Sequence, residues 1–193
     1  MKEYDIVDLA APSPDQRQQA ALILVEAFRE MAPEAWPTME AALEELEECL
    51  GPERIARAAI DEQARVVGWI GGIPGYHGRV WELHPLAVLP AMQNRGIGRQ
   101  LAACLEREVV RRGGLALWLG TDDVAGMTSL AGIDLYPGVI ERLAAIRNLR
   151  RHPFEFYRRA GFELAGVVPD ANGFGRPDIL MAKRVEGGAE GTE

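Results

Sequence analysis

The stretch 86–112 most constrains the fold of this chain. It reads LAVLPAMQNRGIGRQLAACLEREVVRR, so an apolar strand end leads through a glycine-rich, basic loop into a long amphipathic helix. Glycines, here Gly96 and Gly98, let a backbone approach a ligand closely. The first N–H groups of a helix lack partners within it, and with the helix dipole they attract phosphate. The loop therefore predicts a phosphate or pyrophosphate site, to which Arg95 and Arg99 add positive charge.

A strand–helix turn that merely requires glycine is the alternative interpretation of this loop. Its form, from Gln93 to Gly98, is Q/R-x-x-G-x-G/A. Two other phosphate loops are excluded, because the sequence contains neither G-x-x-x-x-G-K-[ST] nor G-x-G-x-x-G after an early strand.

Length and composition predict a single domain over residues 1–185, followed by a short, disordered polar tail over residues 186–193. Cys49 and Cys104 both fall in helical patterns, and we expect buried thiols in a reducing compartment. The first residues lack the pattern of a signal peptide, and no apolar run is long enough to span a membrane. By elimination we expect a soluble, cytoplasmic protein.

The negative charge of the chain is concentrated in its first third. Residues 1–62 hold 15 acidic and 5 basic residues, whereas the remainder is slightly basic. This distribution argues against a nucleic-acid partner. It favours a cationic substrate that is attracted electrostatically, although a negative surface can also serve solubility alone.

Hydrophobic periodicity predicts an α/β (α+β) fold, in which helices flank a mixed, mostly antiparallel central sheet. Thr38 is the expected cap of the second helix, and Pro153 begins the last one. The segment after the fifth strand, residues 120–133, is expected to be a loop. The expected strands are residues 4–9, 55–60, 66–73, 80–88, 115–119, 162–168 and 178–185, and the expected helices are residues 15–31, 39–50, 97–112, 135–149 and 153–160.

The segment WELHPL, residues 81–86, carries a carboxylate and an imidazole on one strand face. Alternate side chains of a strand share a face, so Glu82 and His84 point together. Pro85 cannot donate a ladder hydrogen bond, which predicts a strand edge or a bulge and free backbone N–H groups just after it. Glu82 and His84 are therefore candidates for proton transfer. The alternative is that Glu82 pairs with an arginine and that His84 is a satisfied sheet residue.

Two further segments carry candidate functional groups. Tyr157 lies in the pattern Y-x-x-x-G-F, and its phenol could donate a proton to a departing thiolate, or it could simply be a packed aromatic residue. Asp122 and Asp123 follow the central strand, where open α/β sheets bind ligands. They could bind cationic amines, or they could form a solvated turn. The sequence around them suggests no metal ligand set.

Several segments together resemble an aminoglycoside 6'-N-acetyltransferase of the GNAT superfamily. The resemblance runs in order from Pro52 to Arg184, and it is specific as a set. In one departure, some relatives carry a further acid after the Asp-Asp pair, where this chain has Val124-Ala125-Gly126. The matching segments are PERIA (52–56), WELHPL (81–86), LGTDD (119–123), DLY (134–136), NLRRHPFEFYRRAGF (148–162), VVPDANG (167–173) and RPDILMAKR (176–184).

This resemblance implies a GNAT fold, acetyl-CoA as the acetyl donor, an aminoglycoside as the polycationic acceptor and a homodimer. It implies catalytic roles for Glu82, His84 and Tyr157, with Tyr157 also near the thioester. The acceptor contacts that it implies are Phe28, Trp36, Glu82, His84, Asp122 and Asp123. The cofactor contacts that it implies are Leu86, Ala87, Val88, Gln93, Asn94, Arg95, Gly96, Ile97, Gly98, Arg99, Asn148, Pro153, Phe154 and Tyr157.

Two other functions are compatible with the sequence. The first is a GNAT enzyme that acetylates another amine, such as a polyamine, an amino-acid derivative or a protein lysine. The second is a protein that binds acetyl-CoA or aminoglycosides without turnover. The presence of both Glu82 and Tyr157 argues against the second function. Neither cysteine lies in a plausible nucleophile setting, so we expect direct transfer without an acyl-enzyme.

Overall fold

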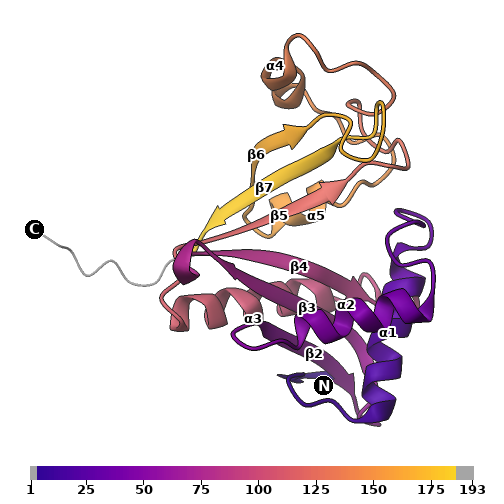
Figure 1. Ribbon diagram of the computed structural model, residues 1–193, viewed down its shortest axis with the longest axis vertical. Helices are drawn as coiled ribbons and strands as arrows, with labels where there is room; N and C mark the ends of the chain where they lie inside the picture. Colours follow the sequence, from indigo (N-terminus) through magenta and orange to yellow (C-terminus); the bar gives the residue numbers. More distant parts are fainter. Residues whose placement is uncertain (1–3, 186–193) are drawn as a thin grey trace, which may run out of the picture. The chain divides into compact units, whose positions relative to one another are not determined.

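The computed structural model describes residues 4–185 and divides them into two compact units (Figure 1). The first unit holds residues 4–29, 33–117 and 184–185. The second unit holds residues 30–32 and 118–183. The predicted tail, residues 186–193, lies outside the described residues.

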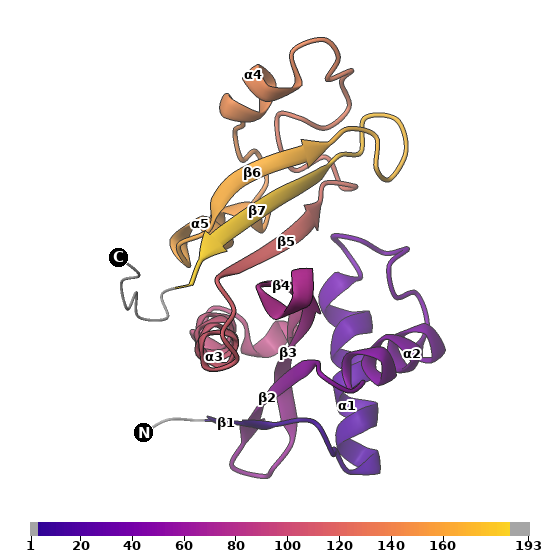
Figure 2. The same ribbon diagram turned by 60° about the vertical axis from the view of Figure 1, so that its left-hand side comes forward.

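The first unit is an antiparallel sheet in the strand order β1-β2-β3-β4. Helix α3 covers one face of this sheet, and α1 and α2 pack together on the other (Figure 2). Its strands are β1 (Tyr4–Asp8), β2 (Ile55–Asp61), β3 (Val66–Gly75) and β4 (Val80–Val88). Its helices are α1 (Pro14–Phe28), α2 (Met39–Cys49) and α3 (Ile97–Arg111), with the short 3₁₀ turns η1 (Tyr76–Gly78) and η2 (Pro90–Met92).

Helices α1 and α2, which cover the same face of the sheet, both start at a side chain that caps the helix N-terminus. The hydroxyl of Ser13 accepts a hydrogen bond from the N–H of Gln16, and the Gln16 side chain accepts one from the N–H of Ser13, which forms a capping box. Thr38 caps α2 through the N–H of Ala41, as predicted. Beneath these helices, the buried Trp69 indole donates to the carbonyl oxygen of Ala20 at 3.0 Å, so α1 is fixed to β3.

The second unit contains three strands in the order β5-β7-β6. Strands β6 and β7 are antiparallel, and α4 packs against β6. Its elements are β5 (Ala116–Asp122, which begins in the first unit), α4 (Val139–Ala144), α5 (Phe154–Arg159), β6 (Glu163–Val168) and β7 (Asp178–Arg184).

The structure confirms the seven predicted strands and the mixed, mostly antiparallel α/β class. Helix 135–149 is wrong in extent, because only residues 139–144 are helical. Pro137 and Gly138, which has φ +97°, delay the start of this helix, and residues 145–149 turn back to form a bridge between Thr128 and Asn148. The loop predicted over residues 120–133 is also displaced, since β5 continues to Asp122. Within residues 4–185, no helix combines the length and the apolar character needed to cross a bilayer.

Candidate active site

The predicted phosphate loop leads from η2 into α3, as the sequence indicates. Gly96 is the residue that caps α3, with φ +85°, and a Cβ atom placed there would meet nothing within 4 Å. The first helical hydrogen bond runs from the N–H of Gln100 to the oxygen of Gly96. The N–H groups of residues 97–99 therefore precede the helical ladder at an open, uncapped N-terminus. This geometry fits a pyrophosphate group.

The residues around this loop fix its path. Asn94 has φ +62°, in the left-handed region that asparagine tolerates better than most residues. The side chain of Gln93 donates to the carbonyl oxygen of Val88 at 3.1 Å, which ties the loop to the end of β4. Arg95 donates to the carbonyl oxygen of Ala91 at 3.5 Å.

Strand β4 presents the predicted acid and imidazole on one partly exposed face. Glu82, His84, Leu86 and Val88 are partly buried, while the residues between them, including Ala87, are buried. This alternation confirms that Glu82 and His84 share a face.

A bulge interrupts the pairing of β4 with β3 beside His84. Ile70 pairs with Leu86 but Gly72 pairs with Leu83, so His84 and Pro85 together oppose Gly71. Pro85 predicted either a strand edge or a bulge, and the structure has a bulge at this position. The His84–Pro85 peptide bond is cis.

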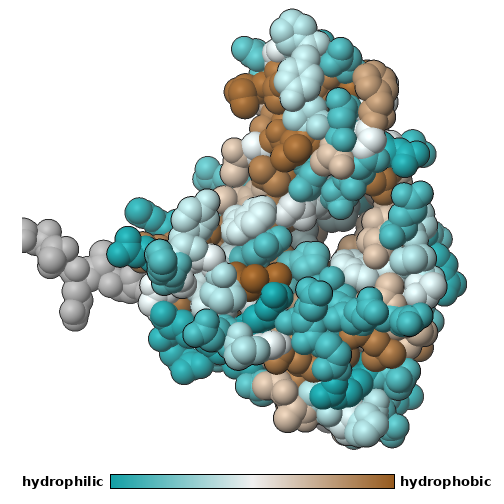
Figure 3. Space-filling view, in the orientation of Figure 1, coloured by the Kyte–Doolittle hydropathy of each residue, from teal (hydrophilic) through white to brown (hydrophobic). Residues whose placement is uncertain are grey.

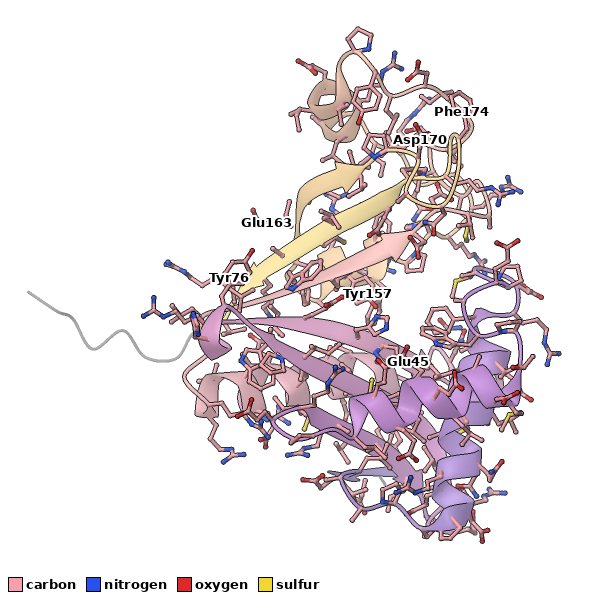
Figure 4. All side chains as sticks on the ribbon, in the orientation of Figure 1. Glu45, Tyr76, Tyr157, Glu163, Asp170 and Phe174 are labelled. Carbon is pink, nitrogen blue, oxygen red and sulfur yellow. The ribbon has the colours of Figure 1, made fainter. Side chains whose placement is uncertain are left out.

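Helix α2 contributes a carboxylate that the sequence interpretation missed. Oε1 of Glu45 lies 3.4 Å from Nε2 of His84, and Oε2 of Glu45 lies 3.4 Å from the indole nitrogen of Trp36. The thiol of Cys49, one turn later, lies 3.3 Å from Oε1 of Glu45. Figure 4 labels Glu45 on α2. We call Trp36, Glu45, Cys49 and His84 the Glu45 cluster.

Electrostatic coupling within the Glu45 cluster shifts the pKa values of both ionisable partners. The contact with His84 holds the pKa of Glu45 below its ordinary value, although burial opposes this effect. Burial alone would lower the pKa of His84, but the contact with Glu45 and the negative charges of Glu45 and Glu82 outweigh it. The net pKa of His84 is therefore raised. Both shifts favour an ion pair between Glu45 and His84.

Of the two aromatic residues predicted for acceptor binding, Trp36 belongs to this cluster and Phe28 lies beside it. The rings of Phe28, at the end of α1, and Trp36 are 4.7 Å apart in an edge-to-face arrangement. The Trp36 ring is in turn 5.9 Å from the His84 ring. The structure thus brings Phe28 and Trp36 close to His84, which is distant from both in the sequence.

The two aspartates at the end of β5 have different environments. Asp123 is 1% exposed, and its carboxylate accepts hydrogen bonds from the N–H groups of Met127 and Thr128, at 2.6 and 2.7 Å. Asp122 is exposed, and its Oδ1 accepts a hydrogen bond from the amide of Asn172 at 2.5 Å. Asp123 therefore organises the loop after β5, whereas Asp122 has the exposure that an acceptor contact requires.

A buried histidine, His152, closes the loop that precedes α5. The N–H of Phe154 donates to Nδ1 of His152, so Nε2 carries the proton and donates to the oxygen of Asp122. Burial lowers the pKa of His152, which favours this neutral form. The amide group of Asn148 donates to the oxygen of His152 and accepts from its N–H. Asn148, a predicted cofactor contact, thus fixes the loop before α5 through two hydrogen bonds to the backbone of His152.

The remaining predicted cofactor contacts of the second unit, Pro153, Phe154 and Tyr157, lie on α5 or directly before it. Pro153 caps the helix, and the side chain of Phe154 is buried. Tyr157 lies on α5 between two aromatic rings, with ring centroids 5.1 Å from Phe156 and 5.8 Å from Phe162. Burial raises the pKa of the Tyr157 phenol, so the phenol keeps its proton at neutral pH. Figure 4 labels Tyr157 on α5.

A signal for Glu45 was present in the sequence. Apolar spacing along α2 predicts a buried stripe of Met39, Leu43, Leu46 and Leu50, whereas the buried residues are Ala42, Leu46 and Cys49. Position 45 lies between these buried positions on the helix surface, so helical spacing from Ala42 and Cys49 points to it. His152 gave no comparable signal. Over residues 4–185, no group of three or more His, Cys, Asp or Glu side chains is arranged to hold a metal ion.

Comparisons with known proteins identify the family. The sequence model of the acetyltransferase (GNAT) family matches residues 21–131. The structure of an aminoglycoside 6'-N-acetyltransferase complexed with coenzyme A is 41% identical, with a TM-score of 0.86, and the match covers 94% of this chain and 97% of that one. The aminoglycoside 6'-N-acetyltransferase from Enterococcus faecium is also 41% identical, with a TM-score of 0.82 and the same coverage.

A third structure, an aminoglycoside 6'-acetyltransferase type Ii, is 36% identical with a TM-score of 0.71 over 94% of this chain and 97% of that one. No curated protein matches the chain at a significant level. The family match spans more than half of the chain, and the structural matches span nearly all of it. The chain, with its open helix N-terminus at Gly96 and its polar residues on β4, therefore belongs to the GNAT acetyltransferase family.

Proposed function

We propose that this GNAT acetyltransferase transfers an acetyl group from acetyl-CoA to the 6'-amine of aminoglycoside antibiotics. The observation that carries this proposal is the similarity, at 41% identity over 94% of the chain, to aminoglycoside 6'-N-acetyltransferases. The acidic first third and the exposed Asp122 supply negative charge for a polycationic acceptor.

The loop before α3 would hold the cofactor by its pyrophosphate. The N–H groups of residues 97–99 and the positive charges of Arg95 and Arg99 provide the binding groups. Acetyl-CoA, when bound, supplies the acetyl group, and its sulfur departs as a thiol. The backbone of Leu86, Ala87 and Val88, just after the bulge in β4, is the proposed contact for the acetyl-bearing arm. An N–H group there would stabilise negative charge on the acetyl oxygen.

The chain's own proton-transfer groups complete the reaction. The acceptor amine must lose protons to become a nucleophile and then an amide, and Glu82 and His84 share the β4 face that accepts them, directly or through water. Tyr157, which is protonated at neutral pH, is the proposed donor to the departing sulfur. Phe28 and Trp36 are proposed to pack against the aminosugar. Direct transfer requires no covalent enzyme intermediate, and burial raises the pKa of the Cys49 thiol, which opposes a nucleophilic role.

Two broader proposals follow from the resemblance. We expect a homodimer, which sedimentation equilibrium would measure directly. We also expect the enzyme to act in the cytoplasm and to protect cells from aminoglycosides, and the minimal inhibitory concentration of kanamycin for a susceptible expression host tests this. A chain that acetylates kanamycin in solution but leaves the inhibitory concentration unchanged would have another physiological acceptor.

The decisive experiment compares acceptors under identical conditions. Thiol release from acetyl-CoA is followed with kanamycin, tobramycin, spermidine and a lysine-rich peptide, and the products are located by mass spectrometry and NMR. We expect the highest kcat/KM for the aminoglycosides and acetylation of the 6'-nitrogen. Comparable slow rates for all four amines would point to another acceptor. Binding without thiol release would indicate a sequestering protein.

A further inference from the structure

The carboxylate of Glu45 is largely buried, which imposes a desolvation penalty on its charge. Glu45 belongs to the flank of α2 that faces the sheet, and its side chain is only 19% exposed, whereas Glu44, Glu47 and Glu48 on the same helix are exposed. Hydrophilic side chains dominate the outer surface around α2 (Figure 3). A carboxylate that is largely withdrawn from water needs partners to offset its desolvation. The partners of Glu45 therefore show what holds it there.

Both oxygens of Glu45 have partners within the Glu45 cluster. Oε2 faces the indole N–H of Trp36 at 3.4 Å, and Oε1 faces both the Cys49 thiol at 3.3 Å and Nε2 of His84 at 3.4 Å. Trp36 and Cys49 thus act as a support that aims one carboxylate oxygen at the imidazole. Contacts of this length between catalytic groups commonly shorten when a substrate binds.

His84 is fixed at its ring and at its backbone. Its ring lies beside Trp36, Nε2 faces Glu45, and its carbonyl oxygen is 3.6 Å from the Cys49 sulfur. Its side chain nevertheless remains 38% exposed. An imidazole has two nitrogen atoms, and a carboxylate that engages one of them selects the other for exchange with a substrate.

We propose that Glu45 is a positioning residue that binds His84 through Nε2, and so assigns Nδ1 as the atom that takes a proton from the acceptor amine. This inference rests on the proposed acetyl transfer, and it adds a residue of α2 to the site on β4. Nδ1 accepts the amine proton, the imidazole becomes imidazolium, and Glu45 stays ionised throughout. The proton then passes from Nδ1 to solvent.

The charges that face His84 come from three parts of the first unit. Glu45 on α2 and Glu82 on β4 favour the protonated ring, whereas Arg54, just before β2, opposes it. The pKa of His84 is raised on balance, which makes its imidazole a stronger base. Replacing Glu45 by glutamine removes one negative charge and preserves the shape of the side chain.

The test compares Glu45→Gln with Glu44→Gln, an exposed neighbour with the same loss of charge. First, proton NMR follows the titration of the His84 ring without any substrate, and His84→Asn assigns its signal among the three histidines. We expect the pKa of His84 to be lower in Glu45→Gln than in the wild type, and to be the same as in the wild type in Glu44→Gln. An unchanged titration in Glu45→Gln would overturn the proposal. Because no acceptor is present, this result is independent of which amine is acetylated.

The second readout is kinetic. In Glu45→Gln, the acidic limb of the kcat/KM profile should move to lower pH, and kcat should fall by about 10- to 100-fold, as for other residues that orient a functional histidine. The KM of the acceptor should change less than twofold. In the His84→Asn background, Glu45→Gln should cause no further loss. A raised acceptor KM with normal kcat, or an equal loss in both backgrounds, would instead make Glu45 a direct acceptor contact and overturn the proposal.

Discussion

Gly71 on β3 lies directly against the backbone carbonyl of His84 on β4, so close that a Cβ atom at position 71 would overlap the carbonyl oxygen. Only glycine fits this approach, which coincides with the bulge formed by His84 and Pro85. Overpacking of an interior typically costs about 1–3 kcal/mol.

Gly71→Ala should therefore lower the free energy of unfolding by about 1–3 kcal/mol and reduce activity by displacing His84. Urea denaturation and kcat/KM measure the two effects. Gly75→Ala is the matched control on the same strand, because a Cβ atom there would lie 3.4 Å from the nearest atom, at ordinary contact distance. Equal behaviour of the two variants would contradict the close approach at the bulge.

Glu82→Gln tests the proposed role of this carboxylate in proton transfer. We expect kcat/KM to fall at least about tenfold at neutral pH, because the amine loses a proton acceptor on the β4 face. Glu62→Gln, in the exposed turn between β2 and β3, makes the same change of charge and should leave kcat/KM unaltered. Unchanged kinetics in Glu82→Gln would remove Glu82 from this role.

Tyr157→Phe removes only the phenolic hydroxyl group from α5. Because this hydroxyl is the proposed proton donor to the sulfur, kcat should fall about 100-fold or more while the KM for acetyl-CoA changes little. Tyr76→Phe is the control, since Tyr76 is 78% exposed on the η1 turn. A large loss of acetyl-CoA affinity with normal kcat would make Tyr157 a packing residue.

Asp122 and Asp123 should separate binding from stability. Asp122→Asn should raise the KM for aminoglycosides by about two- to fivefold, as expected for one exposed charge, with little change in Tm. Asp123→Ala should destabilise the fold by about 2 kcal/mol or more, because two backbone N–H groups lose their acceptor in the interior. Thermal unfolding and steady-state kinetics measure the two effects. A loss of stability in Asp122→Asn, with a raised KM and normal stability in Asp123→Ala, would contradict this assignment.

The ion pair between Glu45 and His84 predicts a window of stabilisation in pH. The pKa of Glu45 is lowered, so its contribution is present above its ordinary value of 4.5 and is lost as the pH falls through the folded-state value. The pKa of His84 is raised, so its contribution is present below its ordinary value of 6.5 and is lost as the pH rises through the folded-state value. The difference in unfolding free energy between the wild type and Glu45→Gln should therefore be largest between pH 4.5 and 6.5. A difference that keeps growing above this window would contradict the ion pair.

The sequence predicted those parts of the fold and site that local pattern determines. Alternation on β4 placed Glu82 with His84, and the loop at Gly96 predicted an open helix start, because both signals lie within a few residues. The role of Asp123 in its loop could not be predicted in this way. Two adjacent aspartates look alike in a sequence, and only the path of the chain after β5 turns one carboxylate toward the backbone of Met127 and Thr128.

The contact between Glu45 on α2 and His84 on β4 could not be predicted either, because it joins residues that are distant in the sequence. Glu45 meets His84 across 39 positions of sequence, so helical spacing can place Glu45 beside the buried positions of α2 but cannot identify its partner on β4. The helix predicted over residues 135–149 failed for a local reason, because the Pro137-Gly138 pair outweighed the apolar spacing that follows it.

The burial of Cys49 has a practical consequence for chemical labelling. Its thiol packs against Glu45, and burial raises its pKa, so it should react very slowly with maleimides. Cys104, on α3, is partly exposed. The chain therefore offers a single preferred position for a fluorophore or a spin label without any substitution, and dyes that detect the thiol of released coenzyme A should meet at most one competing thiol in each protein molecule.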